Sequence, residues 1–282
     1  MSALANPETA AWLAKLRAGA EQPPLRPRLP LWAGAAQIGS VEPEFIAKIC
    51  LSGTVDLREL LLNEERDGVV GWSLAGEPLA TLAYLANVLR EAGLAHAWRN
   101  EQLAVPDADG QRIATVERAV VRGLGIITQA VHLVGVAPDG RHWVQQRAFN
   151  KPNDPGLWDT LMGGMVSAAD TVDTALVRET WEEAGLQVAQ LIDVRPGGRL
   201  TIRRPTSDCA GAGYVVEHID WFVATIPAHL TPVNQDGEVE QFVLMDEAAL
   251  WQRMLRGEFT SEAALIQAAY FEAAGTSLFP TD

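Results

Sequence analysis

The chain has 282 residues, of which 48% are hydrophobic and 21% charged, and its formal net charge is −14. This is the composition of a soluble globular protein long enough for two domains. No apolar run approaches the roughly 20 residues that a membrane-spanning helix needs. The acidic balance argues against a general affinity for nucleic acid, but a metal ion and a few arginines can still hold a small phosphate ligand.

The amino-terminal 22 residues are typical of a short amphipathic helix and lack the basic start, apolar stretch and cleavage site of a secretory signal. The sequence therefore predicts a cytoplasmic protein. Cys50 and Cys209 belong to no metal-binding spacing, so we expect reduced thiols. The oligomeric state stays open at this stage, a homodimer included.

The first 122 residues are expected to form a smaller α+β domain. The proline-rich residues 21–30 favour an extended segment, and residues 31–41 favour one or two strands. Helices are predicted near residues 42–50, with Pro43 in the first turn, and over residues 78–92, ended by Gly93.

Residues 123–282 are predicted to form the second domain, an α+β sandwich. It opens with two extended runs, 125–137 and 141–148, around an Asp-Gly turn. A loop, a glycine pair and a helix at about 171–184 follow. Further strands are expected near residues 200–204 and 215–225, before a helical tail.

The helix at 171–184 carries an unusual stripe. On a 3.6-residue wheel, Glu179 and Glu183 continue the stripe that begins with Val172 and Leu176. The two glutamates repel each other at i,i+4, near the helix end whose dipole disfavours anions. A bound hard cation such as Mg²⁺ or Mn²⁺ would offset this cost.

The alternative interpretation of this helix is a solvated acidic face, on which Arg178 pairs with Glu182 at i,i+4. The opposite face carries Val177, Trp181 and Ala184, which predicts a helix buried on two sides and weakens that alternative.

The spacing around this helix closely resembles the Nudix box. Seven of nine positions match the pattern, namely Gly164, Arg178, Glu179, Glu182, Glu183, Gly185 and Leu186. Asp170 replaces the first glutamate of the box, and Thr180 replaces an aliphatic residue. Because Asp170 is one methylene shorter, we expect its contact to be altered or mediated by water.

The resemblance implies a Nudix α/β/α sandwich that uses Mg²⁺ or Mn²⁺ to hydrolyse a small-molecule pyrophosphate. By similarity, Glu179 and Glu183 would be the main metal ligands, with Glu182 and the Gly163 carbonyl as further candidates. Arg178 would orient a glutamate through an ion pair. The general base would be Glu179 or a carboxylate of a later loop, where Glu238 and Glu240 are the candidates; of these two, Glu240 is the predicted residue.

Shorter matches outside the box, such as Trp98–Glu101, resemble a Nudix subgroup whose amino-terminal domain is related to a segment fused to thiamine pyrophosphokinases. This resemblance favours thiamine diphosphate or its damaged derivatives as substrate, with the amino-terminal domain capping the pocket. Arg147, Trp158 and Arg203 are the predicted substrate-binding residues. Two alternatives stay open: a pyrophosphatase for ADP-ribose, NADH or nucleoside triphosphates, and a ligand-binding module with little turnover.

Overall fold

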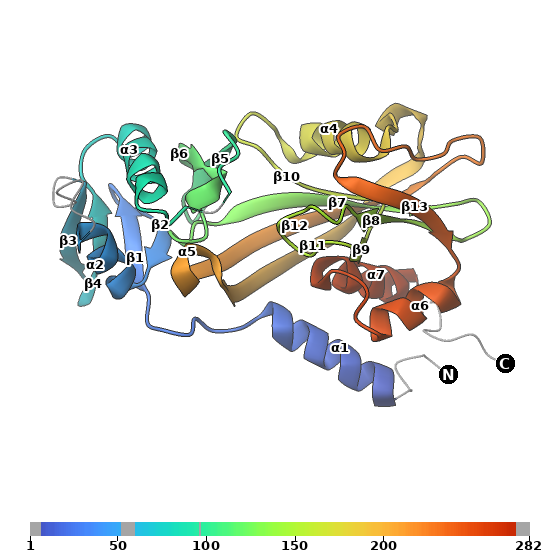
Figure 1. The fold of residues 1–282 in the computed structure, drawn as a ribbon, viewed down its shortest axis with the longest axis horizontal. Helices are drawn as coiled ribbons and strands as arrows, with labels where there is room; N and C mark the ends of the chain where they lie inside the picture. Colours follow the sequence, from blue (N-terminus) through green and yellow to red (C-terminus); the bar gives the residue numbers. More distant parts are fainter. Residues whose placement is uncertain (1–6, 52–59, 96, 275–282) are drawn as a thin grey trace.

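The computed structural model describes residues 7–51, 60–95 and 97–274, which form two parts joined along the long axis of the molecule (Figure 1). The helices are α1 Pro7–Ala20, α2 Pro43–Leu51, α3 Pro78–Glu91, α4 Val172–Ala184, α5 Asp208–Gly211, α6 Glu247–Leu255 and α7 Ser261–Ala274, with short 3₁₀ turns η3 Arg118–Val120 and η4 Val188–Gln190. The strands are β1 Leu29–Ala33, β2 Ala36–Val41, β3 Leu61–Arg66, β4 Val69–Leu74, β5 Gln102–Pro106, β6 Arg112–Glu117, β7 Thr128–Val136, β8 His142–Arg147, β9 Trp158–Asp159, β10 Met162–Met165, β11 Ile192–Thr206, β12 Gly213–Thr225 and β13 Val239–Met245.

The amino-terminal part contains a four-stranded sheet in the order β2-β1-β4-β3, the separate β5-β6 hairpin, and helices α2 and α3. Helix α3 begins where predicted because Pro78 occupies its first turn and the Glu77 side chain accepts hydrogen bonds from the Leu79 and Ala80 amides. Its buried side chains, among them Leu82 and Leu89, join the core of this part.

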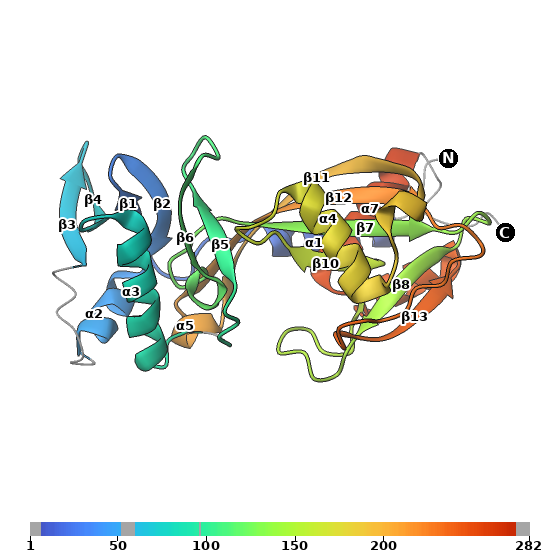
Figure 2. The same cartoon turned by 90° about the horizontal axis from the view of Figure 1, so that it is seen from above.

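The carboxy-terminal part is built on a seven-stranded sheet with the path β11-β12-β7-β8-β13, in which β10 pairs with β7 and β9 with β8. Strands β7 and β12 run parallel, and the other pairs are antiparallel. Helix α4 lies on one side of this sheet, and α1, α6 and α7 lie on the other (Figures 1 and 2). The predicted α+β sandwich with a smaller amino-terminal α+β part is confirmed.

Two segments cross between the parts. The β11–β12 turn reaches into the amino-terminal core, where Cys209 is buried and Ala212 packs beside it. The Arg28 guanidinium holds this turn by donating to the carbonyl oxygens of Ala212 and Gly123, at 2.6 and 3.0 Å. In the opposite direction, α1, which precedes the amino-terminal sheet in the chain, packs on α7 of the carboxy-terminal part.

The packing of α1 is specific. Leu13 is buried with Phe271 in one apolar cluster, and the Trp12 and Trp251 rings meet edge to face at 6.0 Å. An ion pair of 2.7 Å joins Arg17 to Glu272. The first helix and the last helix therefore stabilise each other.

Burial of helix α4 differs from the expectation. Ala184 is fully buried, but Val177 and Trp181 are 52% and 49% exposed. The prediction that this helix is buried on two sides is wrong, because no element of the described residues covers its outer face. Apolar character alone did not distinguish a packed face from an uncovered one.

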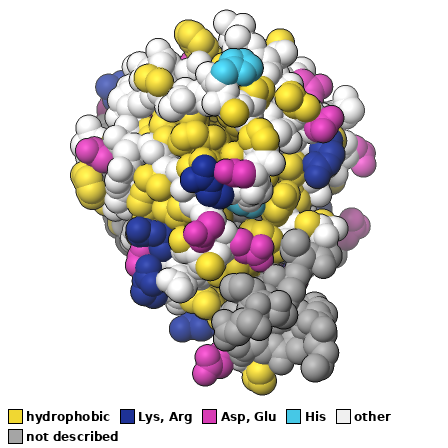
Figure 3. Space-filling view, turned by 90° about the vertical axis from the view of Figure 1, so that its right-hand side faces the viewer, with side chains coloured by type: hydrophobic (Ala, Val, Ile, Leu, Met, Phe, Trp, Pro, Cys, Tyr) yellow, Lys and Arg dark blue, Asp and Glu magenta, His cyan; other side chains and the backbone are white. Residues whose placement is uncertain are grey.

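No helix in the described ranges is both long and apolar enough to span a membrane. The end of the molecule that carries the β7–β8 turn presents apolar side chains around a small group of charged ones (Figure 3). This end lies on the far side of the sandwich from the amino-terminal sheet.

Candidate metal and phosphate site

Helix α4 is held in place at both ends. The Thr171 side chain caps the amino terminus by accepting from the Thr174 amide, and the Thr174 hydroxyl accepts from the Thr171 amide in return. At the other end Gly185 adopts a left-handed conformation with φ of 62°, which ends the helix. The inner face of α4 is thereby fixed against the β10 glycine pair.

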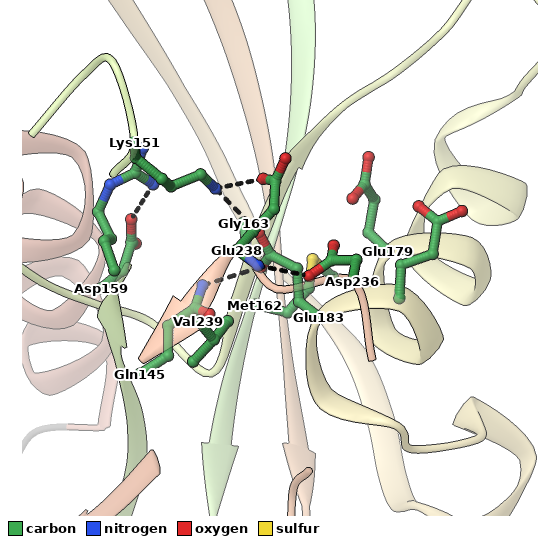
Figure 4. Close-up of polar contacts among 12 residues, drawn as sticks. Gln145, Lys151, Asp159, Met162, Gly163, Glu179, Glu183, Asp236, Glu238 and Val239 are labelled. Carbon is green, nitrogen blue, oxygen red and sulfur yellow. Dashed lines mark hydrogen bonds and ion pairs between the residues drawn. The ribbon is translucent and has the colours of Figure 1, made fainter. Parts of the chain in front are cut away.

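Glu183 is the most buried acid of this face, with only 2% of its surface exposed. One carboxylate oxygen accepts from the Gln145 amide at 2.8 Å and from the Gly163 backbone N–H at 3.0 Å. The other oxygen lies 3.7 Å from the Lys151 ammonium. Figure 4 shows these three donors pointing at Glu183 from outside α4.

Glu179 lies one turn earlier, against Gly164. A Cβ atom at Gly164 would overlap the Glu179 carboxyl group, so only glycine leaves room for this side chain. The carboxylate accepts from Arg178 at 2.9 Å. The glycine pair thus forms a backbone cradle, in which Gly163 donates to one glutamate and Gly164 makes space for the other.

Arg178 forms ion pairs with several acidic side chains around it. Its guanidinium donates to Asp170 at 2.7 and 2.9 Å and to Glu182 at 2.8 Å, in addition to Glu179. The predicted i,i+4 pair and the orienting role towards a glutamate are both present. The contact of Asp170 is direct, so the expectation of a water-mediated contact is wrong: the shorter carboxyl still reaches the arginine.

The electrostatics of the two inner glutamates favour a cation. Burial raises the pKa of Glu179 to about 7, although Arg178 acts in the opposite direction. Burial likewise raises the pKa of Glu183 to about 7, against the lowering effect of Lys151. A buried and a partly buried carboxylate with raised pKa values are better accommodated when a divalent ion supplies positive charge.

The donor set fits such an ion. Carboxylate oxygens and a backbone carbonyl are the hard ligands that Mg²⁺ and Mn²⁺ prefer. Within the described residues no three His, Cys, Asp or Glu side chains form a ready-made metal cluster. In this structure Glu183 faces Gln145 and Gly163, and Glu179 faces Arg178.

These residues open onto a polar cavity of about 900 Å³ between the two parts of the molecule. A loop before β13 brings Asp236 and Glu238 to the cavity, where Glu238 pairs with Lys151 (Figure 4). Arg147 also lines it and forms an ion pair with Asp159 at 3.3 Å.

Of the predicted site residues, the structure brings Gly163, Glu179, Glu182, Glu183 and Arg147 to this cavity. It does not bring the other three predicted residues, Trp158, Arg203 and Glu240, to the cavity.

Trp158 is buried in the apolar cluster under α6 and α7, with the Arg253 guanidinium 5.1 Å from its ring centroid. Arg203 is exposed and pairs with Glu21 at 3.2 Å on the surface. Glu240 is exposed on β13, at the irregularity between Val239 and Gln241 in the pairing of β13 with β8, and it does not line the cavity.

Sequence reasoning missed Lys151, His132 and the amino-terminal residues of the cavity. Lys151 is one of three lysines in the chain and stands in a loop with no motif of its own. His132 lies on β7 with Nδ1 2.9 Å from the Thr160 hydroxyl, and alternation along the strand gives no sign of this partner. Only the fold brings these residues beside the box.

The fold and this glycine–glutamate wall define a domain class. A model of the NUDIX domain matches residues 127–265, so this part of the chain is similar to Nudix domains. Hydrolases of this class generally use divalent metal ions.

Individual relatives are more distant. An uncharacterized protein of Saccharomyces cerevisiae is 26% identical over 182 residues, which are 60% of this chain and 53% of that protein. Nudix hydrolase 24, chloroplastic, of Arabidopsis thaliana is 28% identical over 188 residues, 61% of this chain and 47% of that protein. The chain thus matches about half the length of these relatives.

Among solved structures, a protein of Deinococcus radiodurans is similar with a TM-score of 0.48 and 19% identity, over 60% of this chain and 99% of that one.

Proposed function

We propose that this protein hydrolyses an organic diphosphate with Mg²⁺ or Mn²⁺, and that thiamine diphosphate or its damaged derivatives are the substrate class. The observation that carries the proposal is the pairing of two α4 glutamates, the buried Glu183 and the partly buried Glu179, with the β10 glycine cradle at the edge of a large polar cavity. A diphosphate needs its charge neutralised and a water molecule aligned with one phosphorus atom.

In this proposal Glu179 and Glu183 hold the divalent ion, with Glu182 and the Gly163 carbonyl as further ligands. The ion would neutralise phosphate oxygens and lower the pKa of a bound water. Gln145 and the Gly163 N–H keep the Glu183 carboxylate in one orientation.

Glu179 is our choice for the residue that accepts the proton of the attacking water, because its carboxylate lines the cavity one helical turn from Glu183. For a loop acid, Glu238 replaces the predicted Glu240, because Glu238 lines the cavity and Glu240 does not.

The lining of the cavity supports a polar or cationic organic group on the substrate. Carboxylates from both parts of the molecule face it, and Glu262 and Glu217 lie on its wall together with the box glutamates. This is compatible with the thiazolium cation of a thiamine-type ligand. We also retain residues 1–122 as the cap and 123–282 as the catalytic unit, since side chains of both line the cavity.

A substrate panel tests the proposal. Release of phosphate or of the monophosphate product would be measured for thiamine diphosphate, an oxidised thiamine diphosphate, ADP-ribose, NADH and a nucleoside triphosphate, each with Mg²⁺, Mn²⁺ or a chelator. We expect the highest kcat/KM with a thiamine-type diphosphate and no turnover with the chelator.

Higher kcat/KM with ADP-ribose or NADH would favour the dinucleotide alternative. Binding of thiamine diphosphate in calorimetry, without turnover of any compound, would favour the ligand-binding module. The cytoplasmic location stays part of the proposal, and fractionation of cells would test it, because a relative is named chloroplastic.

A further inference from the structure

Most of the cationic side chains on the cavity wall are already engaged by carboxylates. These pairs are Arg147 with Asp159, Lys151 with Glu183 and Glu238, Arg178 with Asp170, Glu179 and Glu182, Arg122 with Asp208, and Arg204 with Glu262. A guanidinium that is neutralised in this way is a poor partner for a further anion unless its pair is broken.

Arg99 differs from all of these. It lines the cavity from the loop between α3 and β5, and its side chain forms no hydrogen bond or ion pair with any described residue. Its backbone, by contrast, is fixed: the Arg99 N–H donates to the buried Glu117 carboxylate at 2.9 Å. A fixed backbone with an uncommitted guanidinium is an arrangement suited to a ligand.

The turn around Arg99 is braced on its other side. The Trp98 indole N–H donates to Asn100 at 2.9 Å, and Asn100 has a positive φ of 56°. The Arg90 guanidinium lies 4.4 Å from the centroid of the Trp98 ring. These contacts keep the turn in the one conformation that directs Arg99 into the cavity.

Arg118 is the second cation from the amino-terminal part. It follows β6, lines the cavity, and is oriented by Glu101, which accepts from one terminal nitrogen at 2.7 Å. The other guanidinium nitrogens donate to no described residue. Because guanidinium presents its donors in a planar fork, one edge can hold Glu101 while another faces a phosphate.

Both arginines lie close to the loop acid Glu238. Burial raises the pKa of Glu238, but Lys151, and after it Arg99 and Arg118, lower it, and the net pKa falls below its usual range. The amino-terminal arginines and the α4 glutamates line the same cavity.

We propose that Arg99 and Arg118 form a phosphate-binding pair, contributed by the amino-terminal part, that grips the substrate diphosphate from the side opposite α4. The inference deepens the proposed function and rests on it for the identity of the substrate. It makes the diphosphate itself, rather than the organic group, the ligand of the amino-terminal part. A single phosphate monoester would leave one of the two walls without a partner.

The test measures binding and turnover separately. Methylenediphosphonate, whose P–C–P bridge cannot be hydrolysed, would be titrated calorimetrically into wild type, Arg99→Ala, Arg99→Lys, Arg118→Gln and Arg118→Lys in the presence of Mg²⁺. Loss of a charge-assisted contact is expected to raise Kd about 10-fold for Arg99→Ala and Arg118→Gln. The lysine variants keep the charge without the fork and should fall in between.

The matched control is Arg112→Ala, an exposed arginine on β6 that lies outside the cavity and donates to the Ala168 carbonyl. Its Kd should match wild type. With the proposed substrate, Arg99→Ala should raise KM while kcat changes little, because the contact is made in the ground state as well. Thermal unfolding of each variant identifies a folding defect, and Arg99→Ala, at an exposed side chain, is the variant least prone to one.

A Kd for Arg99→Ala and Arg118→Gln within twofold of wild type overturns the phosphate-binding pair, even where the wild-type protein cleaves organic diphosphates. Weakened methylenediphosphonate binding, in a wild type that cleaves none of the panel, leaves the pair standing and overturns the hydrolase proposal instead. The two failures are thus distinguishable.

Discussion

The two walls of the cavity are built in opposite ways. The α4–β10 wall presents buried carboxylates from regular secondary structure, each held by donors from the same part of the chain. The amino-terminal wall presents Arg99 and Arg118 from connecting segments, and Arg99 is exposed. The first wall therefore fixes charge at a cost in desolvation, whereas the second keeps charge in contact with water.

This difference assigns different tasks to the walls. Chemistry needs groups that stay within a fraction of an ångström of their working position, and such precision is available on α4 and β10. Binding of a charged ligand needs accessible cations, which a solvated turn provides. Changes in the first wall should therefore alter kcat, and changes in the second should alter KM.

The largest effect is expected for Glu183→Gln, which removes a charge from the α4–β10 wall but keeps its shape. We expect kcat to fall on the order of 10³-fold, about 4 kcal/mol in the activation free energy. Because burial already disfavours the charged carboxylate, the metal-free variant should unfold at pH 8 at a temperature no lower than wild type.

The control for this change is Glu240→Gln, an equally neutralising substitution at an exposed acid outside the cavity. Its kcat and KM should stay within twofold of wild type. Equal activity of Glu183→Gln and wild type would remove Glu183 from the metal site and with it the distinction between the walls.

A somewhat smaller effect is expected for Gly164→Ala. The added methyl group would overlap the Glu179 carboxyl, which must move away from the cradle. We expect kcat to fall about 100-fold and the Mg²⁺ concentration for half-maximal activity to rise about 10-fold, as for other displaced metal-site groups. Full activity at unchanged Mg²⁺ dependence would show that Glu179 need not occupy this place.

A loss of folding stability in acid should come from a buried histidine outside the cavity, His142. Burial lowers the pKa of His142, on β8, to about 4, and its ring packs against Tyr270 and Phe271 of α7. Since the unfolded imidazole protonates near pH 6.5 and the folded one only near pH 4, stability should be full above pH 6.5. On the order of 3 kcal/mol should be lost as the pH falls to 4.

Urea unfolding of wild type and His142→Gln between pH 7.5 and 4 would measure this loss. The variant should show a flatter dependence than wild type, whereas His229→Gln, at an exposed histidine, should keep the wild-type slope. Parallel slopes for all three proteins would place the acid sensitivity elsewhere.

The smallest effect is expected for a change at Thr180, which lies on α4 next to Glu179. Thr180 is fully buried, and its hydroxyl has no hydrogen-bond partner among the described residues. Thr180→Val keeps the shape and removes the unsatisfied group, so the free energy of unfolding should rise by about 1 kcal/mol. Chemical denaturation would measure it; a decrease would mean that the hydroxyl is satisfied in solution.

The α4–β10 wall could be predicted from sequence because its residues follow one another at fixed spacing, from Gly163 to Leu186. The helix bounds, the capping region and the Arg178–Glu182 pair were all foreseeable from local rules. The exposure of its outer face was not, since Val177 and Trp181 have the apolar character of core residues but lie uncovered among the described residues.

The amino-terminal wall could not be predicted, because Arg99 and Arg118 are separated from the box by tens of residues and share no periodic pattern with it. No strands were predicted for residues 61–74 or 102–117, so the path that delivers these arginines was missing. Trp158, Arg203 and Glu240 were chosen by residue type near the right strands. Trp158 is instead buried under α6 and α7, Arg203 pairs with Glu21, and Glu240 is exposed outside the cavity.

The β11–β12 turn also has a consequence for biogenesis. The amino-terminal core contains Cys209 and Ala212, so a nascent chain that has emerged only as far as β7 lacks two of the buried side chains that close it. Helix α1 waits longer still, since its partner α7 follows β12 in the chain. Although many chains complete their first domain during translation, here the amino-terminal core must await the β11–β12 turn, and premature termination before this turn would yield a product with an open core.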